Sequence, residues 1–222
     1  MIDVNNLEKR YAGRVVLSSL SLRVDKGEGV NIVGRNGSGK TTLLRVLASL
    51  VGFQSGYVAI GGYTLPAESI AVRRCVGFLS HRAQLYTSLT AMENLRFYNR
   101  LYALGLESSR LERQLERVGL RAWQDEQVAY FSRGMIQRLE LARVIAAEPD
   151  VLLLDEPENG LDDDGLEILK DILGEACAQG RVIVMSSHRS SAVTTDFRKL
   201  VLESGMLHEG RARGMKAKVL DV

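Results

Sequence analysis

The feature that most constrains this chain is a glycine-rich run of eight residues between a predicted strand and a predicted helix. It reads Gly-Arg-Asn-Gly-Ser-Gly-Lys-Thr over residues 34–41, after an apolar stretch at 29–33 and before a helical pattern at 42–47. The glycines let successive backbone N–H groups turn toward a phosphate, and the helix start adds the positive end of its dipole. The sequence therefore predicts a phosphate-binding loop and a nucleoside triphosphate site, which comprises Gly34, Arg35, Asn36, Gly37, Ser38, Gly39, Lys40, Thr41 and Thr42.

The last two residues of this loop carry the groups that bind the phosphates and a metal ion. Lys40 supplies a point charge for the β and γ phosphates, and the hydroxyl of Thr41 offers an oxygen ligand to Mg²⁺. Because phosphate loops serve many enzymes, the reaction has to be inferred from the other motifs.

Composition narrows the class of protein. The chain has 222 residues, a formal net charge of +2 and 25% charged residues, so no basic excess indicates a nucleic-acid partner. Apolar runs such as 151–154 are far shorter than the roughly 18 residues that span a bilayer, and residues 1–3 do not begin a signal peptide. We therefore expect a cytoplasmic protein. Cys75 and Cys177 are isolated from each other and are interpreted as reduced thiols without a chemical role.

The order of patterns along the chain predicts an α/β fold. Strand-like stretches at 2–9, 15–24 and 57–60 alternate with turns, and a charged segment at about 89–129 has helical spacing. Further predicted elements are a helix at 133–147, buried strands at 151–154 and 181–186, and a hairpin at 200–207. The helical segment is thus an insertion in a sheet-containing core.

Two carboxylates follow the buried strand at 151–154. Asp155 and Glu156 lie at its C-terminal end, where ligands bind in open parallel sheets. Asp155 is placed to hold Mg²⁺ through a coordinated water, while Glu156 can orient and polarise an attacking water. That second role favours a hydrolase over a kinase.

A histidine follows the next predicted strand. His188 comes shortly after the strand predicted at 181–186, so it is expected beside Glu156 and near the γ-phosphate, where it could stabilise developing charge. The alternative is a structural or merely exposed histidine.

The segment Phe131-Ser132-Arg133-Gly134-Met135 opens the predicted helix at 133–147. It resembles a degenerate form of the LSGGQ signature of ABC transporter ATP-binding subunits, and the likeness extends over nearly the whole chain in the right motif order. The resemblance implies a phosphate-loop NTPase core with an antiparallel β subdomain and an inserted α-helical subdomain at about 86–135, within one ATP-binding domain over 1–222.

The same resemblance implies that two subunits form a head-to-tail dimer. In it, Ser132 and Gly134 would close over ATP held by the phosphate loop of the other subunit. Arg133 stands where the family has a glycine and Met135 where it has a glutamine. This departure favours weak or partner-dependent ATP turnover.

Three further site residues come from the resemblance. Asp162 follows the acidic pair and would connect the two sites across the dimer, and it could also cap the helix after it. Tyr11 stands where the family places an aromatic ring against adenine, although ordinary packing explains a tyrosine there equally well. His81 replaces a glutamine that senses Mg²⁺ and the attacking water, and it either contacts the water or phosphate region or is an exposed loop residue.

The resemblance also implies the partners. They are an integral membrane permease and a second ATP-binding subunit expected to be a copy of this chain. Apolar Leu85, Tyr86 and Leu89 suit a groove for the permease, and core packing explains them equally well. The subunit would then lie at the inner face of the cell membrane as a peripheral protein.

The transported substrate is predicted from a narrower likeness. His81, the segment at residues 89–98 and the short chain together resemble the haem-exporter ATP-binding subunit of cytochrome c biogenesis. The alternatives are a subunit for another substrate and, ranked lower, a soluble ABC ATPase without a transport role or a small-molecule kinase. The long coiled-coil arms or tandem nucleotide domains usual in soluble ABC ATPases are not found in the sequence.

Overall fold

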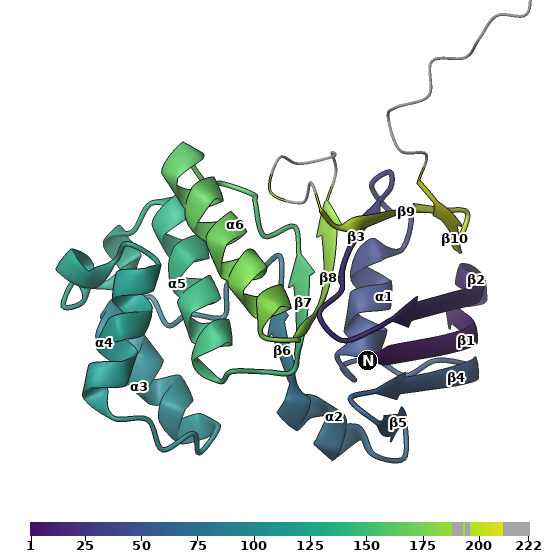
Figure 1. The fold of residues 1–222 in the computed structure, drawn as a ribbon, viewed down its shortest axis with the longest axis horizontal. Coiled ribbons are helices and arrows are strands. Elements are labelled where there is room, and N and C mark those ends of the chain that lie inside the picture. The colour runs from purple at the N-terminus through teal and green to yellow at the C-terminus, as the bar shows by residue number, and fades with distance from the viewer. Residues whose placement is uncertain (188–192, 194–195, 211–222) are drawn as a thin grey trace, which may run out of the picture.

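The computed structural model describes residues 1–187, 193 and 196–210, and it contains two sheets with helices around them (Figure 1). The strands are β1 (Ile2–Tyr11), β2 (Arg14–Val24), β3 (Gly29–Val33), β4 (Ser55–Ile60), β5 (Tyr63–Leu65), β6 (Val76–Leu79), β7 (Val151–Asp155), β8 (Val182–Ser187), β9 (Arg198–Glu203) and β10 (Met206–Glu209). The helices are α1 (Lys40–Leu47), α2 (Ser69–Cys75), α3 (Ala91–Leu101), α4 (Ser108–Arg117), α5 (Arg133–Ala146) and α6 (Asp163–Ala178), with short 3₁₀ turns at Arg121–Trp123 and Val128–Tyr130.

The larger sheet has the strand order β10-β9-β3-β8-β7-β6, and every neighbouring pair except β10 with β9 is parallel. Strands β3, β7 and β8 are buried along their whole length because helices cover both faces of the sheet. Successive side chains of β7 therefore point to opposite faces of the sheet. Val151 and Leu153 pack into the core shared with α1, whereas Leu152 and Leu154 pack into the core shared with α5 and α6.

The smaller sheet is antiparallel, with the order β2-β1-β4-β5. Its inner residues, among them Ile2 and Leu17, join the core around Leu43 of α1, and Figure 1 shows α1 between the two sheets. Strand β1 runs two residues beyond the predicted 2–9 because a tight turn joins it directly to β2. Ala12 and Gly13 in that turn both have left-handed backbone, as a two-residue hairpin turn requires.

Helices α3, α4 and α5 form the far end of the molecule from the antiparallel sheet (Figure 1). Helix α3 begins with a capping box, in which Thr90 and Glu93 each bind the backbone N–H of the other. Apolar residues of the three helices share one core, including Leu95, Leu111 and Leu139. The predicted fold class, an α/β core with an antiparallel sheet and a helical insertion, is confirmed. No helix in the described ranges is both long and apolar enough to span a bilayer.

A buried ion pair joins α5 to the segment that follows β6. Glu140 and Arg143 of α5 have side chains that are 1% and 4% exposed, and their oxygen and nitrogen lie 2.7 Å apart. Glu140 also accepts a hydrogen bond from the backbone N–H of Gln84, and Arg143 lies over the ring of Tyr98 in α3, 4.9 Å from its centroid. The pair therefore ties three segments together at one buried point.

Removal of the Glu140 carboxylate tests how much this ion pair contributes to the free energy of unfolding. In Glu140→Ala, the Arg143 guanidinium stays buried without its counter-charge, so we expect the free energy of unfolding to fall by about 3–5 kcal/mol. Glu112→Ala is the control, because Glu112 pairs with Arg121 at the surface and such a pair contributes about 1 kcal/mol or less. Denaturant titrations of both variants measure the effect, and equal losses would contradict it.

Candidate phosphate and catalytic site

The phosphate loop connects the buried strand β3 to α1. Its backbone is shaped by glycines: Gly39 has a φ of +110°, and a side chain on Gly34 would lie 2.5 Å from the carbonyl oxygen of Leu202. The loop borders an open cavity of about 1320 Å³. All nine residues predicted for this site line that cavity: Gly34, Arg35, Asn36, Gly37, Ser38, Gly39, Lys40, Thr41 and Thr42.

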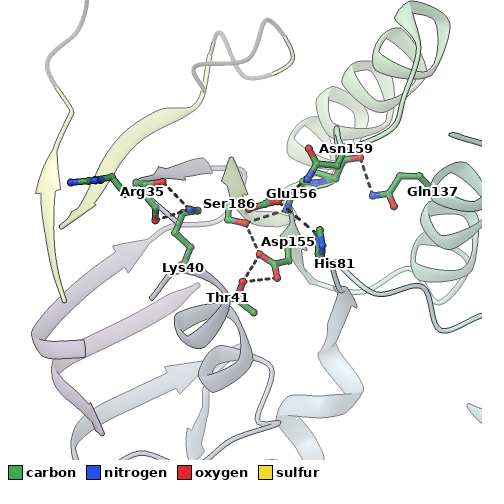
Figure 2. A network of polar contacts seen from close by, with 11 residues as sticks. Arg35, Lys40, Thr41, His81, Gln137, Asp155, Glu156, Asn159 and Ser186 are labelled. Atoms are coloured by element: carbon green, nitrogen blue, oxygen red, sulfur yellow. Dashed lines mark hydrogen bonds and ion pairs between the residues drawn. The ribbon is translucent and has the colours of Figure 1, made fainter. Parts of the chain in front are cut away.

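Lys40 is folded inside its own loop. Its side-chain Nζ donates to the carbonyl oxygen of Gly34 at 2.8 Å and to that of Arg35 at 3.4 Å (Figure 2). The residue is only 5% exposed. The ammonium group is thus held where the loop's backbone curves, as binding of a phosphate requires.

Thr41 and Asp155 meet although 114 positions separate them in the sequence. The Thr41 hydroxyl donates to Oδ2 of Asp155 at 2.9 Å, and the Ser186 hydroxyl donates to Oδ1 at 2.7 Å. Asp155 is 1% exposed and lies opposite Ser186 in the pairing of β7 with β8. These hydroxyl and carboxylate oxygens are the donor type that Mg²⁺ prefers, so the residues fit that ion.

Glu156 leaves the sheet one residue later. Its φ of +55° lies in the left-handed region, which is uncommon for residues other than glycine and is found most often at functional sites. Its backbone N–H donates to the backbone oxygen of Ser186 at 3.2 Å. Its side chain is 12% exposed. Its Oε2 accepts a hydrogen bond from Nδ2 of Asn159 at 2.6 Å and lies 3.7 Å from Nδ1 of His81 (Figure 2). The loop after β6 thus brings His81 to the predicted catalytic carboxylate, and His81 and Glu156 both border the cavity.

The tyrosine predicted to contact adenine is not brought to this cluster. Tyr11 lies at the end of β1 with 45% of its surface exposed, and the ammonium of Lys9 lies 4.5 Å from the centre of its ring. The cavity is lined instead by Arg14, Val15 and Val16, which begin β2, so contact of Tyr11 with adenine stays a prediction. His188 lies outside the described residues.

The residues predicted to act across a dimer cap two helices. The Ser132 hydroxyl accepts from the N–H of Met135 at 3.2 Å and caps α5, and Asp162 accepts from the N–H of Gly165 at 3.0 Å and caps α6. Gly134 has no room for a side chain, since an added Cβ would lie 2.9 Å from the Gly160 carbonyl oxygen. Neither Ser132, Gly134 nor Asp162 lines the phosphate cavity of its own chain.

Two contacts at this site were not predicted from the sequence. Asn159 contacts Glu156, and Nε2 of Gln137 in α5 donates to the carbonyl oxygen of Pro157 at 3.0 Å (Figure 2). Both residues sit in motifs that were recognised, the loop after the acidic pair and the helix after Ser132. Their side-chain targets depend on how these two motifs pack, which residue spacing does not reveal.

The comparison with known families decides the identity. The family model described as ABC transporter matches residues 17–159, which include the phosphate loop, the Ser132 segment and the acidic pair. The chain belongs to the ABC transporter family. It is an ATP-binding subunit of the family and an ATPase.

Similar ABC proteins include transporters and resistance proteins. The chain is 33% identical over 195 residues to the ABC transporter ATP-binding protein NatA of Bacillus subtilis, covering 85% of this chain and 79% of NatA. It is 35% identical over 221 residues to the daunorubicin resistance ATP-binding protein DrrA3 of Streptomyces coeruleorubidus, covering 98% and 70%. A solved dimer of an ATP-binding cassette in a post-hydrolysis state, bound to ADP and Pi, superposes with a TM-score of 0.83 at 26% identity, covering 97% of this chain and 100% of that chain.

This ABC subunit also carries an unusual carboxyl group next to Glu156. Oε2 of Glu158 is buried and has no hydrogen-bond partner in the part of the chain that the structure describes. Burial raises the pKa of Glu158 from its ordinary 4.5 to about 7, and the nearby charge of Glu156 adds to the rise. Near neutral pH, Glu158 is therefore partly protonated.

The raised pKa predicts a pH-dependent gain of stability in Glu158→Gln. The folded chain holds this proton more tightly than the unfolded chain, so the wild type loses relative stability as the pH rises from 4.5 through about 7. Because Gln cannot ionise, the free energy of unfolding of the variant should exceed that of the wild type by about 2–3 kcal/mol at pH 8. At pH 5 the difference should be less than about 1 kcal/mol. Denaturant titrations at both pH values measure this, and a gain that does not change with pH would refute it.

Proposed function

We propose that this chain is the ATP-hydrolysing subunit of an exporter, coupling ATP-driven dimer closure and hydrolysis to a membrane permease. The observation that carries the proposal is the convergence of two carboxylates at one strand end. Asp155 is bound to the Thr41 hydroxyl at the phosphate loop, and Glu156 faces the same cavity.

The two carboxylates have separate roles in this proposal. Thr41 and Asp155 would hold Mg²⁺, which neutralises charge on the phosphates when bound. Lys40 engages the β and γ phosphates with its ammonium group. Glu156 accepts a proton from the attacking water while the water oxygen bonds to the γ-phosphorus, and the bond to the β-phosphate oxygen breaks to release ADP and phosphate.

His81 and Glu156 act together in this proposal. The imidazole Nδ1 of His81 lies 3.7 Å from Oε2 of Glu156, so it is placed to hydrogen-bond the water or the phosphate region beside that carboxylate. Nitrogen is a poorer ligand for Mg²⁺ than oxygen, and we assign His81 no metal contact. His188 remains a candidate for stabilising the transferred phosphoryl group.

A second copy of the chain would complete the site. We infer a head-to-tail homodimer in which Ser132 and Gly134 of one subunit close over the ATP of the other, with Asp162 connecting the two sites. The dimeric state of the similar solved cassette supports this, and so does the position of these three residues outside the chain's own phosphate cavity.

The permease and the substrate are inferred from relatives. A daunorubicin resistance protein among them supports export of an organic compound, with this subunit peripheral on the inner face of the cell membrane. Haem export in cytochrome c biogenesis rests on His81, residues 89–98 and the short chain, and neither relative described above is named for haem. We therefore rank export of another substrate first and haem export second.

The role of Glu156 is tested with Glu156→Gln. The amide cannot accept the proton of the water, so we expect ATP binding to persist, hydrolysis to fall about 100-fold or more, and an ATP-bound dimer to accumulate. Steady-state phosphate release and size-exclusion chromatography with ATP measure these effects. Glu167→Gln, the same change at an exposed position of α6, should leave both unchanged. Normal hydrolysis in Glu156→Gln would remove Glu156 from the central role.

The transport role is tested by capture of partners. We expect tagged Glu156→Gln, purified from native membranes with ATP and Mg²⁺, to retain an integral membrane permease that mass spectrometry identifies. Recovery of cytochrome c maturation proteins would make haem the preferred transported substrate. Recovery of another permease would exclude haem, and recovery of soluble proteins only would contradict the transporter role.

A further inference from the structure

Asn159 makes a short hydrogen bond to the carboxylate that we assign to water activation. Its side-chain Nδ2 donates to Oε2 of Glu156 at 2.6 Å, whereas Nδ1 of His81 lies 3.7 Å from the same oxygen. Figure 2 shows the two side chains reaching Glu156 from different loops. A hydrogen bond to an ionised acceptor is stronger and more directional than a neutral one, so the amide restricts how the carboxylate can rotate.

This contact is not needed to close the loop in which it lies. The backbone N–H of Asn159 already donates to the backbone oxygen of Glu156 at 3.1 Å, and the N–H of Leu161 donates to the oxygen of Glu158 at 3.3 Å. Gln137 of α5 also donates a hydrogen bond to the carbonyl oxygen of Pro157. The turn is therefore formed by the backbone and by α5, and the exposed side chain of Asn159 adds a hydrogen bond to Glu156.

The backbone of Glu156 is held in place by its neighbours. Its N–H is bound by both oxygens of Ser186, and its left-handed φ sets where the side chain leaves the chain. A general base works only when its oxygen lies within hydrogen-bond reach of the proton that it takes. The direction of the carboxylate is then set by the side chains that contact it.

We propose that Asn159 is a positioning residue for ATP hydrolysis, whose amide holds Oε2 of Glu156 and thereby orients the carboxylate toward the attacking water. The inference rests on the proposed role of Glu156. It assigns Asn159 no contact with ATP and no part in its binding.

Kinetics of Asn159 variants test the proposal in the full-length chain. Asn159→Ala removes the amide, and we expect kcat to fall about tenfold, which is the effect of a misoriented base worth about 1.4 kcal/mol. Asn159→Asp puts a second negative charge against Oε2 and should lower kcat about 100-fold. In both variants, the KM for ATP should stay within twofold of the wild-type value and Tm should not change.

Asn5 provides a matched control. Its amide donates to Oδ1 of Asp3 at 2.8 Å on the antiparallel sheet, so Asn5→Asp makes the same chemical change beside a carboxylate far from the phosphate cavity. Its kcat should equal the wild-type value. A purely structural role for Asn159 would instead lower Tm or raise KM along with any loss of kcat.

The double variant separates this inference from the proposed function. Adding Asn159→Ala to Glu156→Gln should cause no further loss in single-turnover hydrolysis, because the group that Asn159 orients is already disabled. An unchanged kcat in Asn159→Ala, or an equal tenfold loss in the Glu156→Gln background, would overturn the inference. Normal hydrolysis by Glu156→Gln itself would overturn the proposed function instead.

Discussion

The whole site depends on a buried carboxylate at the end of a buried strand. Asp155 has almost no exposure to water, so its negative charge requires donors within the protein. The hydroxyls of Thr41 and Ser186 supply them, and they come from α1 and β8. These contacts exist only when β7 and β8 pair in their observed register and when the phosphate loop delivers α1 to the same edge of the sheet. A slip of one residue would turn Asp155 to the opposite face.

Adjacent carboxylates acquire different properties because the chain direction changes between them. Asp155 is the last residue of β7 and is immobilised by two hydroxyl groups, whereas Glu156 has left-handed backbone and points into the cavity border. Glu158, two residues further on, has a buried Oε2 without a hydrogen-bond partner among the described residues, and its pKa is raised. Three acidic groups within four positions are thus distinguished by burial and by their donors, so one short segment provides three different carboxyl environments.

The sequence was sufficient for the parts of the fold that local chemistry determines. The glycine pattern at 34–41, the apolar run at 151–154 and the acidic pair after it all carry a local signal, and each lies in the structure where that signal predicts. The meeting of His81 with Glu156 could be expected only through family resemblance, since 75 positions separate the two residues. Contacts such as that of Asn159 with Glu156 depend on side-chain rotamers and on the exact path of a loop. Neither can be predicted from composition or periodicity.

Helix α5 links the loops that converge on Glu156. Its first turn is capped by Ser132, its Gln137 holds the carbonyl of Pro157 beside Glu156, and its Glu140 holds the backbone of Gln84 close to His81. A rigid helix transmits displacement along its axis, so any partner that moves the Ser132 end also moves both anchor points. The Ser132 segment and the position of the Glu156 carboxylate are therefore physically connected through one continuous element.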